Sequence, residues 1–198
     1  MGLIQKLIEK GLSEVKIAGF GDSLTYGWLV SKGYLDFLKE ILKEKYPNIK
    51  LRIANLGVPG DTARDGLRRA NELVKEKPDI TIIQFALNDA FSGFTPKDFR
   101  ANMAKIADFI YNNTTSKIIF STSVPVAYPY ENSVAELFYK EIESLAMEMN
   151  TPLAKVHEYW KSKISAGEFT HGSLVQSDGV HPLEQGYRLM AECIAQEL

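Results

Sequence analysis

The sequence predicts a three-layer α/β/α fold, in which a five-stranded parallel sheet is covered by helices on both faces. Two observations predict it. Short apolar runs alternate five times with helical patterns across short connections, as in parallel sheets. The run 80–86, Ile-Thr-Ile-Ile-Gln-Phe-Ala, is nearly continuous in β-branched and aromatic residues, as in a strand buried on both faces. A chain of 198 residues that is 45% hydrophobic suits a single domain spanning 1–198.

The first element is expected to be an amphipathic helix within residues 1–13. Its apolar positions are interleaved with Lys6, Glu9 and Lys10, unlike the uninterrupted apolar core of a signal peptide. We therefore expect a cytoplasmic protein, and no apolar run approaches the roughly 18 residues of a membrane span. The run that begins at Val15 and closes in a Gly-x-Gly turn is the first strand, and Ser23 follows its carboxyl end.

The remaining elements continue the alternation. Helical periodicity predicts helices over 34–45, 62–77, 96–112, 133–149, 158–164 and 182–197. Runs of strand formers predict strands over 51–56, 80–86, 117–123 and 152–156. An aromatic and proline-rich loop covers 124–132, and a polar loop covers 165–177. We expect the flavodoxin-like strand order 2-1-3-4-5, although the pattern is compatible with other doubly wound orders.

The composition argues against several classes of function. A formal net charge of −2, with Lys and Arg scattered along the chain, gives no electrostatic footprint for nucleic acid. The single cysteine, Cys193, excludes an internal disulfide, and its helical spacing indicates a buried small hydrophobe. No pair among His157, His171 and His181 has the spacing of metal ligands, so we expect no metal.

The stretch 19–23 fits neither of two common glycine motifs. The nucleophile elbow G-x-S-x-G requires a glycine where this chain has Thr25. The dinucleotide fingerprint requires a third glycine at Leu24, and Asp22 would oppose a phosphate, which also disfavours a flavodoxin-like cofactor carrier. Taken alone, the stretch favours a turn serine over a nucleophile. Asp22 and Asp89 are expected to bond backbone amides and so hold their turns.

Three strand ends place complementary groups at one edge of the predicted sheet. Ser23, Gly57 and Asn88 directly follow the first, second and third strands. In open parallel sheets, ligands bind beyond the carboxyl ends of the strands, near the point where the strand order reverses. A hydroxyl nucleophile, an unobstructed glycine N–H and a donating amide suit acyl transfer, which needs donors aimed at the developing oxyanion.

The segment Asp178-Gly-Val-His181 supplies a candidate base. Its three-residue spacing lets the carboxylate reach Nδ1–H of the imidazole while Nε2 points outward, as Ser-His-Asp chemistry requires. Pro182 suits the first turn of the final helix, so we expect the pair on the loop entering that helix. The alternative is that Asp178 caps the helix and His181 is a surface residue.

These blocks, in this order, resemble the SGNH (GDSL) hydrolase family of esterases, lipases and acylhydrolases. They are Gly21-Asp22-Ser23-Leu24, the Gly-Val-Pro-Gly turn at Gly57, Asn88-Asp89 and Asp178-x-x-His181. The resemblance implies Ser23 as nucleophile, His181 as base and Asp178 as its partner. It also implies an oxyanion hole formed by the Ser23 N–H, the Gly57 N–H and the Asn88 side chain. One position departs from the family pattern, because Ala86 stands where the family has glycine.

The prediction is a serine esterase that hydrolyses small-molecule carboxylic esters through an acyl-enzyme, without a cofactor. The short loops favour small or flexible acyl groups, and aromatic residues on the rim are candidates for lining an acyl or aryl pocket: Trp28, Phe91, Phe94, Tyr128 and Tyr130. Carbohydrate O-deacetylation, thioester cleavage and lysophospholipid hydrolysis stay open on the same triad. A non-catalytic acyl- or sugar-binding module is the alternative of another class. His157 is expected at a helix entry, and His171 lacks an adjacent carboxylate.

Overall fold

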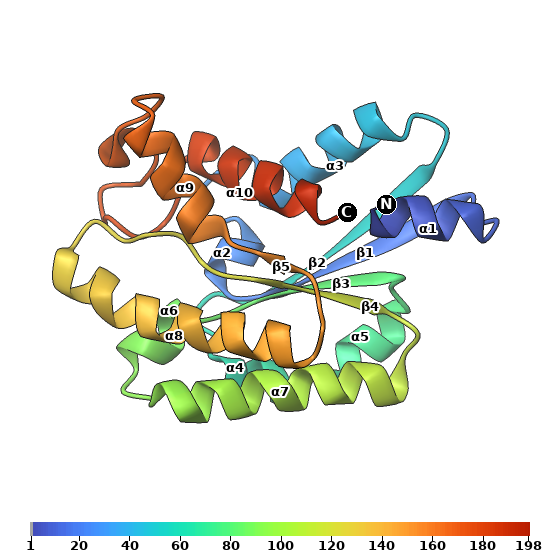
Figure 1. The fold of residues 1–198 in the computed structure, drawn as a ribbon, viewed down its shortest axis with the longest axis horizontal. Helices are drawn as coiled ribbons and strands as arrows, with labels where there is room; N and C mark the ends of the chain where they lie inside the picture. The colour runs from blue at the N-terminus through green and yellow to red at the C-terminus, as the bar shows by residue number, and fades with distance from the viewer. Residues whose placement is uncertain (1) are drawn as a thin grey trace.

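The computed structural model describes residues 2–198 and contains a five-stranded parallel sheet in the order β2-β1-β3-β4-β5 (Figure 1). The strands are β1 (Glu14–Gly21), β2 (Lys50–Gly57), β3 (Ile80–Gln84), β4 (Lys117–Ser121) and β5 (Leu153–Ala154). The predicted fold class and strand order are confirmed. The order reverses between β1 and β3, so this is the switch point at which such sheets bind ligands.

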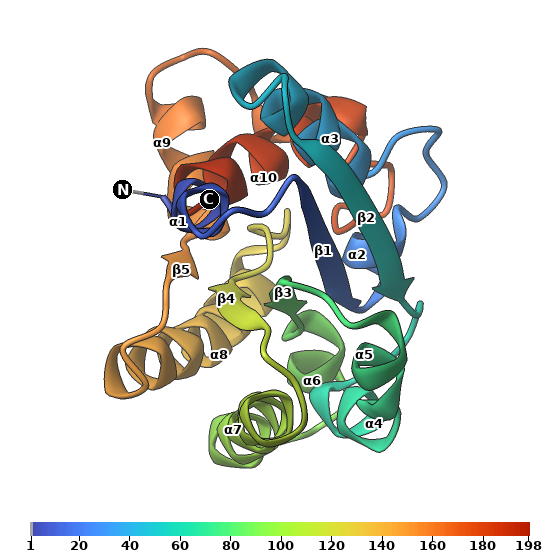
Figure 2. The ribbon, with the colours of Figure 1, turned by 90° about the vertical axis from the view of Figure 1, so that its right-hand side faces the viewer.

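Helices cover both faces of the sheet (Figure 2). One layer contains α1 (Leu3–Glu9), α3 (Tyr34–Lys45), α9 (Val156–Ser165) and α10 (Glu184–Gln196). The other contains α4 (Ala63–Arg68), α5 (Asn71–Glu76), α6 (Leu87–Phe91), α7 (Pro96–Asn113) and α8 (Pro129–Glu148). The short helix α2 (Ser23–Tyr26) begins just after β1. A single turn of 3₁₀ helix, His171–Ser173, lies between α9 and α10.

The core lies between the sheet and these two layers. Every residue of β3 is buried, as its continuous apolar run predicts. Phe20 of β1 packs edge-on against Phe85, with 5.6 Å between the ring centroids. Each large apolar side chain buried in this way contributes about 1.5–3 kcal/mol. The strands are therefore held firmly, and the loops at their carboxyl ends rest on a rigid frame.

The register of the sheet brings three carboxyl ends level. Gly21 at the end of β1 pairs with Gly57 of β2 and with Gln84 of β3. The segments that follow these strands therefore leave the sheet side by side. Helix α1 lies at the opposite end of the molecule, beside the carboxyl end of the chain (Figure 1), where the Ile4 amide donates to the Leu198 carbonyl at 3.0 Å.

The helix predicted over 62–77 is two helices, α4 and α5, which meet at Arg69 and Ala70. Backbone hydrogen bonds around the junction join residues three apart, such as the Arg69 amide to the Gly66 carbonyl at 3.1 Å. No proline or glycine marks residues 69–70, so the periodicity continues through the break. The break coincides with a residue whose side chain bonds to the ends of two strands, as described below.

Other boundaries also differ from prediction, and β3, β4 and β5 all end before their predicted last residues. Helix α8 begins at Pro129 rather than at 133, because proline at the first helical position has its φ angle already set for a helix. Helix α10 begins at Glu184, so Pro182 precedes it and Leu183 is its N-cap. Asp178 is therefore not the cap of this helix. Residues 87–91, for which no helix was predicted, form α6.

Candidate active site

Ser23 is positioned by the turn between β1 and α2. Asp22 is the N-cap of α2, and its Oδ1 accepts a hydrogen bond from the Leu24 amide at 2.9 Å. The turn requires glycine at position 21, since a Cβ there would lie 2.2 Å from Thr25 Oγ1. Ser23 is only 7% exposed, yet its hydroxyl lies 2.9 Å from His181 Nε2.

His181 lies on a loop closed by short backbone bonds. The Gln176 amide donates to the His181 carbonyl at 2.8 Å, and the Gly179 amide donates to the Gln176 carbonyl at 2.9 Å. Gly179 has a φ angle of +71°, a conformation that favours glycine. The structure thus places the Asp178–His181 segment opposite Ser23, although 158 positions separate His181 from the serine in the sequence.

Asp178 holds the imidazole in one orientation. Its Oδ2 lies 2.7 Å from His181 Nδ1, and its Oδ1 accepts from the amides of Val180 and His181, both at 2.9 Å. Burial alone would raise the pKa of Asp178, but the hydrogen bonds from Val180 and His181 outweigh it and hold this pKa below its ordinary value. An ionised Asp178 accepts from Nδ1–H, which leaves Nε2 facing the Ser23 hydroxyl.

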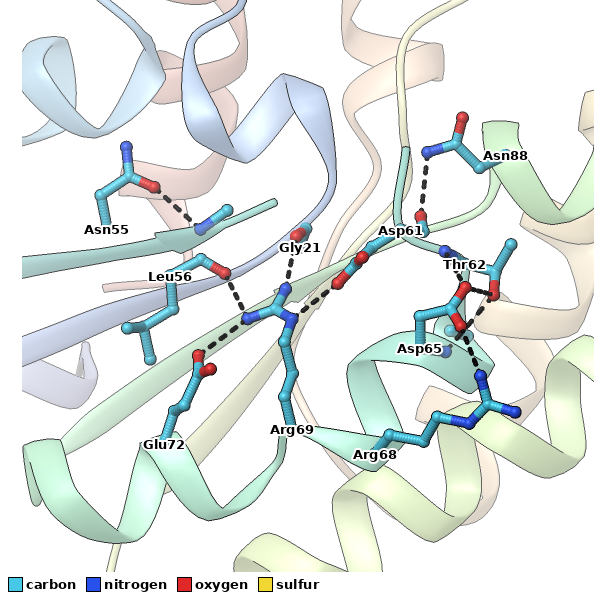
Figure 3. A network of polar contacts seen from close by, with 12 residues as sticks. Gly21, Asn55, Leu56, Asp61, Thr62, Asp65, Arg68, Arg69, Glu72 and Asn88 are labelled. Carbon is cyan, nitrogen blue, oxygen red and sulfur yellow. Dashed lines mark hydrogen bonds and ion pairs between the residues drawn. The ribbon is translucent and has the colours of Figure 1, made fainter. Parts of the chain in front are cut away.

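Gly57 is a glycine for a reason other than oxyanion binding. A Cβ at Gly57 would lie 2.2 Å from the Tyr26 backbone nitrogen, so α2 can approach β2 only because no side chain is present. The Gly57 N–H donates to Asn55 Oδ1 at 2.9 Å (Figure 3). The Gly57 N–H therefore already has an acceptor, and the structure differs here from the expectation that this N–H is free.

Gly60 lies three residues further on, in a tight turn. The Asp61 amide donates to the Val58 carbonyl at 3.1 Å, and Gly60 has a φ angle of +87°, which makes 58–61 a turn with Pro59 and Gly60 at its centre. Within residues 2–198, the N–H groups of Gly60 and Ser23 have no acceptor. A Cβ on Gly60 would meet nothing within 4 Å. The sequence analysis did not select Gly60, although its place as the second glycine of the Gly-Val-Pro-Gly turn was a signal that could have identified it.

Asn88 lies beside this turn. Its Nδ2 donates to the Asp61 carbonyl at 2.9 Å (Figure 3), so one of its two amide hydrogens is used and one is left. Asn88 is the second residue of α6, the helix that follows β3 and has the buried Ala86 as its N-cap. Ser23, after β1, and Asn88, after β3, thus lie at the same edge of the sheet as the turn after β2.

Two buried aspartates hold the turns of the site, as predicted. Asp22 caps α2, and both carboxylate oxygens of Asp89 accept from the Ala63 amide, at 2.9 and 3.1 Å. Burial raises the pKa of Asp22 to about 7 and that of Asp89 to about 6. Neither aspartate is exposed to solvent.

The other two histidines do not join Ser23. His157 is the second residue of α9, which confirms its predicted place at a helix entry, and its Nδ1 lies 3.0 Å from Thr122 Oγ1. His171 lies in the 3₁₀ turn, and burial lowers its pKa. Cys193 is buried in α10, which confirms its predicted packing role.

One cluster has a spacing that metal ions accept. Ligand atoms of Glu143, His157 and Glu158 lie within 4.8 Å of one another. The Lys155 ammonium occupies the same cluster, 3.1 Å from Glu143 and 3.3 Å from Glu158. This ammonium already pairs with both carboxylates, so the cluster is explained as an ion-pair network.

Aromatic side chains border the candidate site. The Trp28 ring lies 6.1 Å from the His181 ring, between centroids, and the Trp28 carbonyl accepts from Gln176 Nε2 at 2.9 Å. Phe91, Tyr128 and Tyr130 are exposed, on or next to helices α6 and α8 rather than in long loops. Phe94 lies beneath the Arg64 guanidinium, 4.8 Å from it to the ring centroid.

A serine bonded to a histidine that is bonded to a carboxylate, at the carboxyl edge of a parallel sheet, is the arrangement of serine hydrolases. The model of the GDSL-like Lipase/Acylhydrolase family matches residues 20–189. The chain therefore belongs to this family, and it is an esterase of the GDSL/SGNH type.

The chain is similar to several characterised proteins. An arylesterase from Vibrio mimicus is 27% identical over 186 residues, covering 92% of this chain and 88% of the arylesterase. The thioesterase 1/protease 1/lysophospholipase L1 of Escherichia coli K12 is 23% identical over 181 residues, covering 90% and 80% respectively. The crystal structure of Axe2, an acetylxylan esterase from Geobacillus stearothermophilus, shares the fold, with a TM-score of 0.81 at 19% identity over 92% of this chain and 93% of that chain.

No helix in the described part of the chain, 2–198, combines the length and the apolar character that crossing a bilayer requires. The cytoplasmic location that the sequence predicts stays a prediction.

Proposed function

We propose that this chain is a serine esterase in which Ser23 attacks the ester carbonyl and His181 takes the serine proton. The observation that carries this proposal is the pair of hydrogen bonds that joins Ser23 Oγ to His181 Nε2 at 2.9 Å and His181 Nδ1 to Asp178 Oδ2 at 2.7 Å. With Nδ1–H donated to the carboxylate, Nε2 is free to accept the hydroxyl proton. The ionised Asp178 then stabilises the imidazolium that forms.

The proposed oxyanion hole combines three donors: the N–H groups of Ser23 and Gly60 and the side-chain amide of Asn88. Gly60 replaces Gly57 in this proposal because the Gly57 N–H donates to Asn55, whereas the Gly60 N–H has no acceptor within 2–198. The hydrogen bond from Asn88 to the Asp61 carbonyl keeps the amide next to Gly60. Removing one such donor typically costs ~10²–10³ in rate.

The reaction then proceeds in two steps. Attack by Ser23 gives a tetrahedral intermediate whose oxyanion accepts from the three donors, and His181 returns the proton to the leaving alkoxide. The acyl group remains on Ser23. Water, deprotonated by His181, attacks the acyl-enzyme and releases the acid by the reverse route.

The open rim supports esters with small or flexible acyl groups as substrates. Exposed Tyr26 follows Ser23 on α2, and exposed Tyr128 borders the catalytic loop, where the Ala127 amide donates to the Gly179 carbonyl at 2.8 Å. The relatives carry names that refer to aryl esters, thioesters, lysophospholipids and acetylxylan. Carbohydrate O-deacetylation, thioester cleavage and lysophospholipid hydrolysis are accordingly the alternatives for the same triad.

The test is hydrolysis of p-nitrophenyl esters from acetate to dodecanoate, together with an acetylated sugar, an acyl thioester and a lysophospholipid. We expect turnover that peaks at short or medium acyl chains. Ser23→Ala is expected to lower kcat by at least ~10³-fold, because the nucleophile is lost. The matched control is Ser31→Ala, which removes an exposed serine on the loop after α2.

Two outcomes would contradict the proposal. Wild-type turnover that survives in Ser23→Ala would assign the reaction to another nucleophile. A folded wild-type protein that hydrolyses none of these substrates, yet binds acyl or sugar ligands equally well with and without the Ser23 hydroxyl, would favour the non-catalytic binding module.

A further inference from the structure

Arg69, at the junction of α4 and α5, makes four hydrogen bonds through its side chain at the carboxyl edge of the sheet. Its Nε donates to Asp61 Oδ2 at 2.6 Å, and its Nη2 donates to the Gly21 carbonyl at 2.9 Å. Its Nη1 donates to the Leu56 carbonyl at 2.9 Å and to Glu72 Oε2 at 3.1 Å. Four of the five guanidinium hydrogens are therefore accounted for (Figure 3).

These contacts join the segments that carry all three proposed oxyanion donors. Gly21 lies two residues before Ser23, and Leu56 is the penultimate residue of β2, the strand that leads to Gly60. The Asp61 carboxylate accepts from Arg69, while the Asp61 carbonyl accepts from Asn88 Nδ2. One side chain thus spans the end of β1, the end of β2 and, through Asp61, the start of α6.

The guanidinium is fixed in place as well as bonded. Its central carbon lies 4.4 Å from the centroid of the Phe20 ring, so the planar group stacks on a core aromatic. The side chain is 15% exposed, and that of its partner Asp61 is 16% exposed. A lysine has no planar group to stack and cannot donate in three directions of a fixed plane. Only arginine can make this set of contacts.

We propose that Arg69 is a positioning residue that sets the spacing of the oxyanion donors. Its donors are directed into the protein at strand-end carbonyls and carboxylates, so it does not contact substrate. It acts by keeping the Ser23 turn, the Gly60–Asp61 turn and Asn88 at one mutual distance while charge develops on the carbonyl oxygen. This inference rests on the proposed function, since it presupposes that these donors bind an oxyanion.

The experiment compares Arg69→Lys and Arg69→Met with the same two substitutions at Arg68. Arg68 is the adjacent residue, but among the described residues its exposed side chain bonds only to Asp65, within its own helix. For each variant, kcat and KM are measured with a p-nitrophenyl ester. Inhibition constants are measured for a trifluoromethyl ketone, which forms a tetrahedral adduct with serine, and for the product carboxylate, which does not.

We expect kcat to fall about tenfold in Arg69→Lys and roughly 10²-fold in Arg69→Met, with KM changed less than about threefold. The affinity for the trifluoromethyl ketone should fall by the same factor as kcat/KM, because both quantities depend on oxyanion binding. Affinity for the product carboxylate should stay within about threefold of wild type. Both Arg68 variants should match the wild type in every measurement.

Several outcomes would overturn the inference. One is a folded Arg69→Met with wild-type kcat and ketone affinity, which would leave Arg69 a purely stabilising residue. Another is a parallel loss of affinity for ketone and carboxylate, which would indicate general damage to the site. Should Arg69→Met fail to fold, Arg69→Lys and Asp61→Asn give the same comparison. Failure of the proposed function is separate, because it would appear as Ser23-independent turnover in the wild type.

Discussion

Asp178 uses its two oxygens for two separate purposes. Oδ1 accepts the amides of Val180 and His181 and shapes the turn, whereas Oδ2 accepts from His181 Nδ1 and sets the tautomer. Asparagine can preserve the first purpose through its carbonyl oxygen, but its amide group cannot accept from Nδ1–H. The substitution Asp178→Asn therefore tests the role of Asp178 in setting the His181 tautomer while the hydrogen bonds that shape the loop are kept.

For Asp178→Asn we expect kcat to fall by about 10²–10⁴-fold while the thermal midpoint changes little. The reason is that Nδ1 must become the acceptor, so that Nε2 carries the proton and cannot take one from Ser23. Steady-state hydrolysis and thermal unfolding measure the two effects. Asp108→Asn, on the exposed face of α7, is the control, and an Asp178→Asn enzyme with wild-type kcat would remove Asp178 from the proposed mechanism.

The residues of the site differ in how well sequence alone could locate them. Ser23, His181 and Asp178 were predicted because strand alternation, a three-residue spacing and an ordered set of motifs identify them. The sequence could not decide between Gly57 and Gly60 in the same way, because both are glycines of the same Gly-Val-Pro-Gly segment. It depends on the Asn55 side chain, which accepts from the Gly57 N–H, and on the contact between Asn88 and Asp61. The contact between Asn88 and Asp61 joins residues 27 positions apart and has no local sequence signature.

Helix α2 is capped by a fully buried carboxylate. Burial raises the pKa of Asp22 from 3.8 to about 7, although the Leu24 amide and Gln84 side chain lower it. The native protein thus keeps a proton that the unfolded chain has released, so ionising Asp22 costs folding free energy. Stability should fall as pH rises from about 4 to 7 and then level off.

Asp22→Asn should abolish this part of the pH dependence. The asparagine carbonyl can still accept from the Leu24 amide, so the cap is kept while the titration is removed. Between about pH 5 and 8 we expect the wild type to lose about 2–3 kcal/mol of unfolding free energy relative to Asp22→Asn, measured by urea denaturation. Asp89 titrates in both proteins and cancels. Parallel pH profiles for the two proteins would show that Asp22 does not titrate in this range.

Whole elements were predictable where a helix or strand has local signals at both ends. Helix α3 matches its predicted bounds, and β3 was recognised from its apolar run. The break between α4 and α5 was not, because its cause is tertiary: Arg69 bonds to two strand ends. Gly66 gives a second tertiary reason, since a Cβ there would lie 2.5 Å from the buried Phe85 ring. Close packing of α4 on the sheet, rather than helix propensity, decides this region.

At the scale of the whole molecule, the two ends of the parallel sheet differ in the segments and side chains that they carry. Turns that follow β1, β2 and β3 converge at one end, as expected for parallel strands with a switch point between β1 and β3. The same end has many of the exposed large apolar side chains, on segments that follow strand ends: Tyr26, Leu29, Val58, Phe91, Tyr128 and Tyr130. The alternation of strands and helices predicted the parallel sheet, and the observed strand order is the one we expected among several doubly wound orders compatible with the pattern. Three of the exposed rim residues, Phe91, Tyr128 and Tyr130, were also expected at the rim from the sequence.

The opposite end, where the Ile4 amide bonds to the Leu198 carbonyl at 3.0 Å, has a consequence for chain connectivity. Because the first helix begins beside the end of the last helix, a short Gly/Ser linker can join residues 2 and 198. New termini can then be opened at Gly167, which is exposed and lies in the turn after α9. Such a circular permutant would present its histidine and aspartate before its serine. We expect it to retain kcat within about threefold, since the order of residues along the chain is immaterial to a site assembled by the sheet.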